Sequence, residues 1–112
     1  MPRKQLEEVV TGIYLEPVPI TVGEEVKIKY KGELTKNNAD KIYLHTGFGY
    51  QNWRDVQDLP MRKTRDGGWT ATMKITDNSC FNFCFHDSAM NWDNNSGRDW
   101  TYEIHEGDPV SH

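Results

Sequence analysis

The sequence has few hydrophobic residues and no long run of them. Only 36% of its 112 residues are hydrophobic, and the mean hydropathy is -0.81. No apolar stretch approaches the roughly 18 to 20 residues that a membrane-spanning helix needs. The first ten residues, MPRKQLEEVV, carry acidic side chains where a signal peptide has an apolar segment. We therefore expect a soluble, cytoplasmic protein with no membrane partner.

Basic residues are also in the minority. The 13 Lys and Arg residues are outnumbered by 17 Asp and Glu, which gives a formal net charge of -4. Affinity for duplex nucleic acid comes mostly from neutralising phosphates, so an acidic chain is poorly suited to that partner. The charge balance predicts no nucleic-acid partner and favours a neutral ligand.

Cysteine is scarce as well, with Cys80 and Cys84 in the segment CFNFC. On a strand these two lie on one face, roughly 13 Å apart, which is too far for a disulfide. Free thiols are typical of a reducing compartment. His86 shares their face, but the paired spacing of a zinc site is absent. The oxygen-rich loop 93–99 does not match an EF-hand, although another kind of calcium site stays open there. We expect no cofactor.

Catalytic motifs are missing too. Ser, His and Asp occur without a nucleophile elbow, and no glycine-rich loop could cradle a phosphate. Asp87 and Asp93 lie in an open loop that offers no reason for a raised pKa. The sequence therefore indicates a protein that is not an enzyme.

What the sequence does contain is alternation. Apolar and polar residues alternate strictly in five segments, which predicts half-buried β-strands at 26–31, 42–45, 69–76, 80–86 and 100–105. Two weaker strands are expected at 12–16 and 59–64, and turn residues separate the segments. About seven short strands in one domain's length predict an all-β, immunoglobulin-like antiparallel β-sandwich. We expect this domain to span 9–107, between loose tails at 1–8 and 108–112.

Aromatic residues are more frequent than so polar a chain suggests, at 12% of the sequence with four Trp. Trp69 and Trp100 lie on alternating strands and are expected in the core. Trp53 and Trp92 lie in the polar segments 47–58 and 87–99, beside amides and carboxylates. An exposed indole can stack on a sugar ring while amides bond its hydroxyls. These two tryptophans therefore predict a carbohydrate site, unless they fold inward and cap the sandwich.

Three blocks in order carry a family resemblance: IYLHTGF followed by NW, then GGWTATMKI, then FNFCFHDSAMNWDNNSGRDWTYEI. Over roughly residues 25 to 105 the chain resembles the starch-binding carbohydrate-binding modules of families 25 and 53. The resemblance implies an immunoglobulin-like sandwich that binds α-1,4-glucans such as starch or glycogen without cleaving them, and a glucan-metabolising enzyme as a partner. It implies His45, Trp53 and Trp92 as ring contacts and Asn94 and Asn95 as hydroxyl-bonding amides.

Two other functions remain open on the sequence. A small β-barrel could stack single-stranded nucleic acid on the same rings, using the basic residues Lys27, Lys29 and Lys31 and the cluster Arg62, Lys63 and Arg65. Alternatively, the lysine face could dock a protein and so tether a glucan-metabolising enzyme. Salt dependence separates the first from glucan binding, and co-purification of an enzyme tests the second.

Overall fold

The computed structural model describes residues 7–10, 12–37 and 39–106. These residues form eleven strands and one 3₁₀ helix at Glu33–Asn37. The strands are β1 (Glu7–Val10), β2 (Ile13–Glu16), β3 (Ile20–Thr21), β4 (Glu25–Tyr30), β5 (Ile42–Phe48), β6 (Arg54–Pro60), β7 (Arg62–Lys63), β8 (Trp69–Lys74), β9 (Cys80–Asp87), β10 (Trp92–Asp93) and β11 (Trp100–His105).

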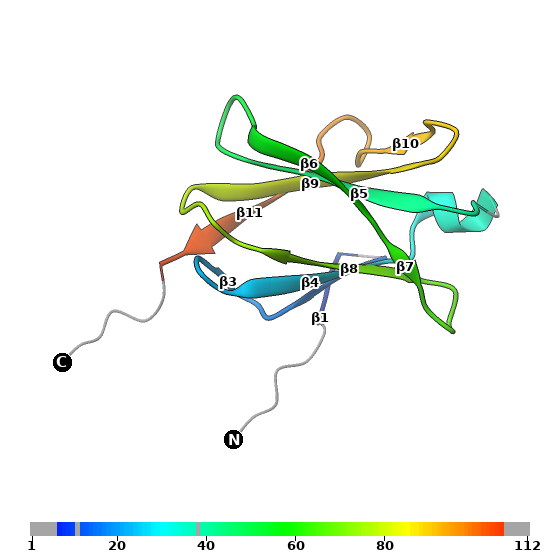
Figure 1. Ribbon diagram of the computed structural model, residues 1–112, viewed down its shortest axis with the longest axis horizontal. Coiled ribbons are helices and arrows are strands. Elements are labelled where there is room, and N and C mark those ends of the chain that lie inside the picture. Colours follow the sequence, from blue (N-terminus) through cyan, green and yellow to red (C-terminus); the bar gives the residue numbers. More distant parts are fainter. Residues whose placement is uncertain (1–6, 11, 38, 107–112) are drawn as a thin grey trace, which may run out of the picture.

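The strands form two sheets that face each other in two layers (Figure 1). The first sheet has the order β1-β2-β4-β8-β7, and the second has the order β3-β11-β9-β5-β6 with β10 paired to β9. Every pairing is antiparallel except that of β11 with β3. The predicted all-β sandwich is confirmed, while its immunoglobulin-like topology stays a prediction.

Alternation along the strands builds the core between the sheets. On β4, Val26, Ile28 and Tyr30 are buried, and on β5 Ile42 and Leu44 are buried while their neighbours are only partly covered. The inward side chains of β9 and β4 stack, as in the Tyr30–Phe85 pair with ring centroids 4.0 Å apart. The core contains Trp69, and Trp100 packs against it, as expected.

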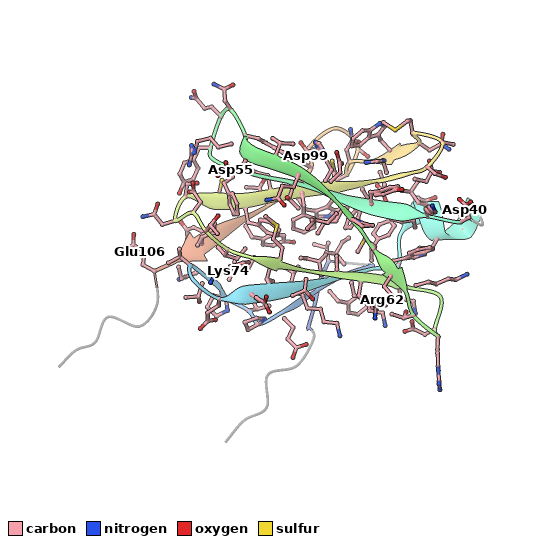
Figure 2. The ribbon with its side chains drawn as sticks, viewed as in Figure 1. Asp40, Asp55, Arg62, Lys74, Asp99 and Glu106 are labelled. Carbon is pink, nitrogen blue, oxygen red and sulfur yellow. The ribbon has the colours of Figure 1, made fainter. Side chains whose placement is uncertain are left out.

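The chain changes sheets within a segment that the sequence presented as one strand. Residues 59–64 were expected as a single strand, but β6 ends at Pro60 in the second sheet and β7 begins at Arg62 in the first (Figure 1). Buried Met61 lies at the crossing point. Figure 2 shows Arg62 beside the lower layer, past this crossing. The expected loop 47–58 is correspondingly shorter, because β5 runs to Phe48 and β6 starts at Arg54.

The other differences concern the edges of the sandwich. Residues 1–6 and 107–112, most of the expected tails, lie outside the described residues, and β1 begins at Glu7. Both cysteines are free, as predicted, and both are buried. Within the described ranges, no helix is long and apolar enough to cross a membrane.

Candidate functional site

The outer face of the second sheet carries a cluster of five rings. Strand pairing places Tyr43 of β5 opposite His86 of β9, and Trp92 of β10 opposite His86 on its other side. His45 follows two residues after Tyr43 on the same face of β5, and Trp53 comes from the loop before β6. We call Tyr43, His45, Trp53, His86 and Trp92 the ring cluster.

Contacts run through the ring cluster without a break. The centroid of the His45 ring lies 5.8 Å from that of Trp53 and 5.2 Å from that of Trp92. His86 lies 4.5 Å from Trp92 and 5.1 Å from Tyr43. Trp92 is 43% exposed, and Trp53 is half-buried. The structure therefore brings His45, Trp53 and Trp92 together on one accessible surface.

The two indoles are not parallel. The plane of His45 is tilted by 33° from that of Trp53 and stands at 88° to that of Trp92. A ring inclined moderately to the imidazole and a ring perpendicular to it cannot be coplanar. The surface is therefore angled around His45 rather than flat.

The position of Trp53 depends on the absence of a side chain at Gly47. A Cβ atom added at Gly47 would lie 2.7 Å from both Cβ and Cε3 of Trp53, so the indole lies directly against the strand backbone. Beyond Trp53, Arg54 Nη2 donates to Asp77 Oδ2 (2.7 Å) and ties this loop to the segment before β9. Hydrogen bonds from Ser79 and then Arg54 lower the pKa of Asp77 to about 2.

Trp92 is held by anchors on both sides of it. Before it, Asp87 Oδ1 accepts hydrogen bonds from the backbone N–H groups of Ala89 (3.0 Å) and Asn91 (2.8 Å), and the Asn91 bonds lower the pKa of Asp87. After it, Asp93 turns inward and accepts a hydrogen bond from the Tyr30 hydroxyl. Burial raises the pKa of Tyr30, and the bond to Asp93 raises it further. Strand alternation thus points Trp92 outward while Asp93 is fastened to the opposite sheet.

Asp58 of β6 joins the two histidines. Its Oδ1 accepts a hydrogen bond from His45 Nδ1 (2.7 Å) and another from His86 Nε2 (2.9 Å). Partial burial acts to raise the pKa of Asp58, but the bonds from His45 and His86 outweigh it and lower that pKa below its ordinary value of 3.8. Asp58 itself remains half exposed.

The predicted amides lie in the loop that follows β10. Asn94 Oδ1 accepts from Gly97 N (2.9 Å), and Asn95 Nδ2 donates to the backbone oxygen of Asp99 (3.1 Å). These bonds shape the loop, and neither amide belongs to the ring cluster. Figure 2 shows Asp99 above the second sheet, where this loop lies.

The same loop covers β9, and this explains a departure from the alternation pattern. All eight residues of β9 are buried, including the outward-facing Cys84 and His86. Burial, then the charge and hydrogen bond of Asp99, raises the pKa of the Cys84 thiol to about 12. A thiol in that state is a poor nucleophile and metal ligand. Within 7–10, 12–37 and 39–106, no three His, Cys, Asp or Glu side chains are grouped to hold a metal.

Sequence reasoning missed Asp58 and assigned His86 no part in the surface. The signal for His86 was its place on the outward face of 80–86, where it was considered only as a zinc ligand. Asp58 gave no signal, because its pairing with His45 depends on a bulge between β5 and β6 at Thr46 and Phe48. Gly47 gave none either, because the packing of Trp53 against it is a tertiary contact.

Some hollows of the molecule lie away from the ring cluster. One of about 430 Å³ is bordered by Leu59, Arg62 and Thr72, where β6, β7 and β8 meet. The lysine face is on the first sheet, where Lys29 Nζ and Lys31 Nζ lie 2.5 Å and 3.7 Å from Asp66 Oδ2. This pairing with Asp66 reduces the positive charge that the nucleic-acid hypothesis requires.

Comparison with known proteins gives consistent results. The model of the starch/carbohydrate-binding module (family 53) matches residues 26–83. That range includes His45 and Trp53 and ends before Trp92. An alpha-amylase of Clostridium acetobutylicum is 38% identical over 80 residues, which is 70% of this chain and 10% of the amylase. The chain thus matches only about a tenth of that relative's length.

A solved structure supports the fold. The iodinated CBM25 from a Bacillus halodurans amylase superposes with a TM-score of 0.55 and 21% sequence identity, over 78% of this chain and 90% of that one. The family model covers more than half of the chain, and its range includes β5 and β6, which bear or flank Tyr43, His45 and Trp53 of the ring cluster. This chain belongs to the starch/carbohydrate-binding module family 53.

Proposed function

We propose that this chain binds α-1,4-glucans such as starch, glycogen and maltooligosaccharides, without cleaving them, through the ring cluster. The single observation that carries the proposal is the exposure of Trp92 and the partial exposure of Trp53 on either side of His45. Large aromatic rings that face solvent mark a binding surface, because an apolar ring gains free energy when a ligand covers it.

The angle between the indoles favours a curved ligand. Flat β-linked chains such as cellulose suit coplanar rings, whereas the α-1,4 linkage turns each glucose relative to the last. Two indoles set at a large angle can stack on successive faces of such a turning chain. Anchors on both sides of Trp92 hold it in place before binding, and packing on Gly47 with the Arg54–Asp77 bond holds Trp53, which reduces the entropy lost when the ligand binds.

Hydroxyl recognition is assigned to the loop after β10. The Nδ2 group of Asn94 and the Oδ1 atom of Asn95 have no hydrogen-bond partner among the described residues, since each amide uses its other atom within the loop. One donor and one acceptor are thus left for glucose hydroxyls. With few rings and bonds in contact, the Kd for a short oligosaccharide should be roughly 10 µM to 1 mM.

The experiment is calorimetric titration with maltoheptaose and, in parallel, with cellohexaose. Binding of the first and not the second is expected, and Trp53→Ala and Trp92→Ala should each weaken it. The matched control is Tyr14→Ala, because Tyr14 lies on β2 in the other sheet. If both tryptophan variants bind as tightly as the wild type, the ring cluster is not the site.

The proposal also covers the enzyme, the polymer and the compartment in which the module acts. The similarity to a segment of an alpha-amylase favours a role in holding a glucan-metabolising enzyme close to its polymer. Multivalent contact with a polymer would strengthen a modest affinity. The two free thiols suit a reducing, cytoplasmic compartment, where glycogen is the polymer expected. Co-sedimentation of the enzyme with glycogen, with and without the module, tests this role.

A further inference from the structure

Asp58 lies beside the ring cluster, on the edge strand β6 opposite His45. A single oxygen, Oδ1, accepts from both imidazoles, and each imidazole contacts Trp92, with centroids 5.2 Å away for His45 and 4.5 Å away for His86. His45 also contacts Trp53. The Asp58 carboxylate therefore bonds both imidazoles, and through them it is connected to every other ring of the cluster.

The bond to Asp58 decides which nitrogen of His45 carries a proton. An ionised carboxylate only accepts hydrogen bonds, so Nδ1 of His45 must be the donor. In the neutral ring this leaves Nε2 unprotonated. Nε2 has no partner among the described residues and is not one of their buried, unpaired atoms, so its lone pair is open to a ligand. His45 is thereby presented as a hydrogen-bond acceptor.

The second imidazole gains a fixed orientation from the same oxygen. His86 Nε2 faces Asp58 Oδ1, and His86 Nδ1 lies 3.1 Å from the backbone oxygen of Asp87. The ionised Asp58 accepts from Nε2, so the neutral ring carries its proton there, and a turned ring would lose that bond. His86 is buried, and its ring is stacked on Tyr43 and tilted by 41° against Trp92, which it contacts.

We propose that Asp58 is the positioning residue of this site: it fixes both imidazoles and sets His45 to accept a hydrogen bond from a glucan hydroxyl. This proposal rests on the proposed function, and it adds that the sugar hydroxyl is the hydrogen-bond donor and His45 is the acceptor. A sugar hydroxyl over His45 donates a hydrogen bond to Nε2, while Asp58 holds Nδ1 from the neighbouring strand.

The test compares the wild type with Asp58→Asn and with a matched control, Asp55→Asn. Asp55 lies three residues earlier on β6, is exposed and takes part in no ring contact among the described residues (Figure 2). The carboxamide keeps the size of Asp58 but is neutral, and its NH₂ group can donate to His45 Nδ1, so it no longer confines the proton there.

Two readouts are taken. Histidine ¹⁵N spectra of the ligand-free proteins at neutral pH should show the His45 proton on Nδ1 in the wild type and in Asp55→Asn, and a shift toward Nε2 in Asp58→Asn. Maltoheptaose titration should show a Kd up to about tenfold higher for Asp58→Asn, which is the scale of the one neutral hydrogen bond lost between the sugar hydroxyl and His45. The Asp55→Asn protein should bind as the wild type does.

The outcomes separate this inference from the proposed function. A wild-type spectrum with the His45 proton on Nε2 overturns the positioning role, whatever the protein binds, and it needs no variant to fold. Unchanged affinity of Asp58→Asn together with an unchanged spectrum overturns it as well. A wild type that binds no glucan but shows the Nδ1 proton refutes the proposed function and leaves the assignment of His45 standing.

Discussion

Gly47→Ala is the substitution that tests how Trp53 is positioned. Gly47 lies on the outward face of β5, two residues after His45. An added Cβ would lie 2.7 Å from Cβ and Cε3 of Trp53 and 3.0 Å from its Cδ2. Contacts of this kind are ordinarily about 3.5 to 4.0 Å. The indole must therefore move away from the strand by roughly 1 Å, and its contact with His45 changes.

The expected effect falls on both affinity and stability. Alanine reduces the freedom of the unfolded chain, but the resulting gain of about 0.4 to 1 kcal/mol applies only where the new side chain fits without strain. Here the added methyl group would lie 2.7 Å from Trp53 Cβ, so the loop backbone must shift with the indole and the protein should be less stable. A misplaced stacking ring forfeits about 1 kcal/mol or somewhat more of binding free energy, so the Kd for maltoheptaose should rise roughly five- to tenfold. Calorimetric titration and thermal unfolding measure the two quantities separately.

Gly68→Ala is the matched control. A Cβ there would approach Lys29 Cε at 2.8 Å and Lys31 Cγ at 2.9 Å, but these belong to flexible side chains next to the other sheet. This variant should bind maltoheptaose normally. If Gly47→Ala also binds normally, with unchanged tryptophan fluorescence, the packing of Trp53 on the strand does not set the surface.

Three further predictions concern the supports of the site and the core. Tyr30→Phe removes the hydroxyl that donates to Asp93 and accepts from Leu34 N–H, and should lower the free energy of unfolding in urea by about 1 to 3 kcal/mol; an unchanged urea midpoint would show that these two bonds contribute nothing. Thr46→Val replaces a buried hydroxyl that has no hydrogen-bond partner, so the unfolding free energy should rise by about 1 kcal/mol, and a fall would mean that the hydroxyl is bonded in solution. Hydrogen bonds led by those of Ser79 hold the pKa of Asp77 at about 2 against an ordinary 3.8, so its stabilisation is complete above about pH 4 and is lost as the pH falls through 2. Asp77→Asn should reduce the loss of unfolding free energy over this pH range. An equal loss in both proteins would contradict the role given to Asp77.

Local patterns were sufficient to predict the core of this fold. Period-two alternation identified β4, β5, β8, β9 and β11 because each buries one face between the sheets. It failed at residues 59–64, where the chain leaves one sheet for the other at Met61. No local pattern marks such a crossing, since each half reads as extended chain. It failed again for the outer face of β9, because the loop after β10 folds back over that face and buries it.

Site residues could be predicted only where a residue type did not suit the segment around it. Trp53 and Trp92 were noticed because large rings in polar loops have no local reason to be buried, and neither belongs to the core. His45 depended on a family resemblance. Asp58 could not be predicted, because an aspartate on an exposed edge strand is common. Its role depends on the register between β5 and β6, which places it opposite His45 and which a single sequence does not specify.

The most direct test of the central claim is the titration of the wild type with maltoheptaose while tryptophan fluorescence is followed. If the ring cluster binds α-glucan, maltoheptaose should change the emission of the indoles and saturate at a Kd of roughly 10 µM to 1 mM, and the double variant Trp53→Ala, Trp92→Ala should abolish both effects. Saturable binding of maltoheptaose that survives in the double variant would contradict the account.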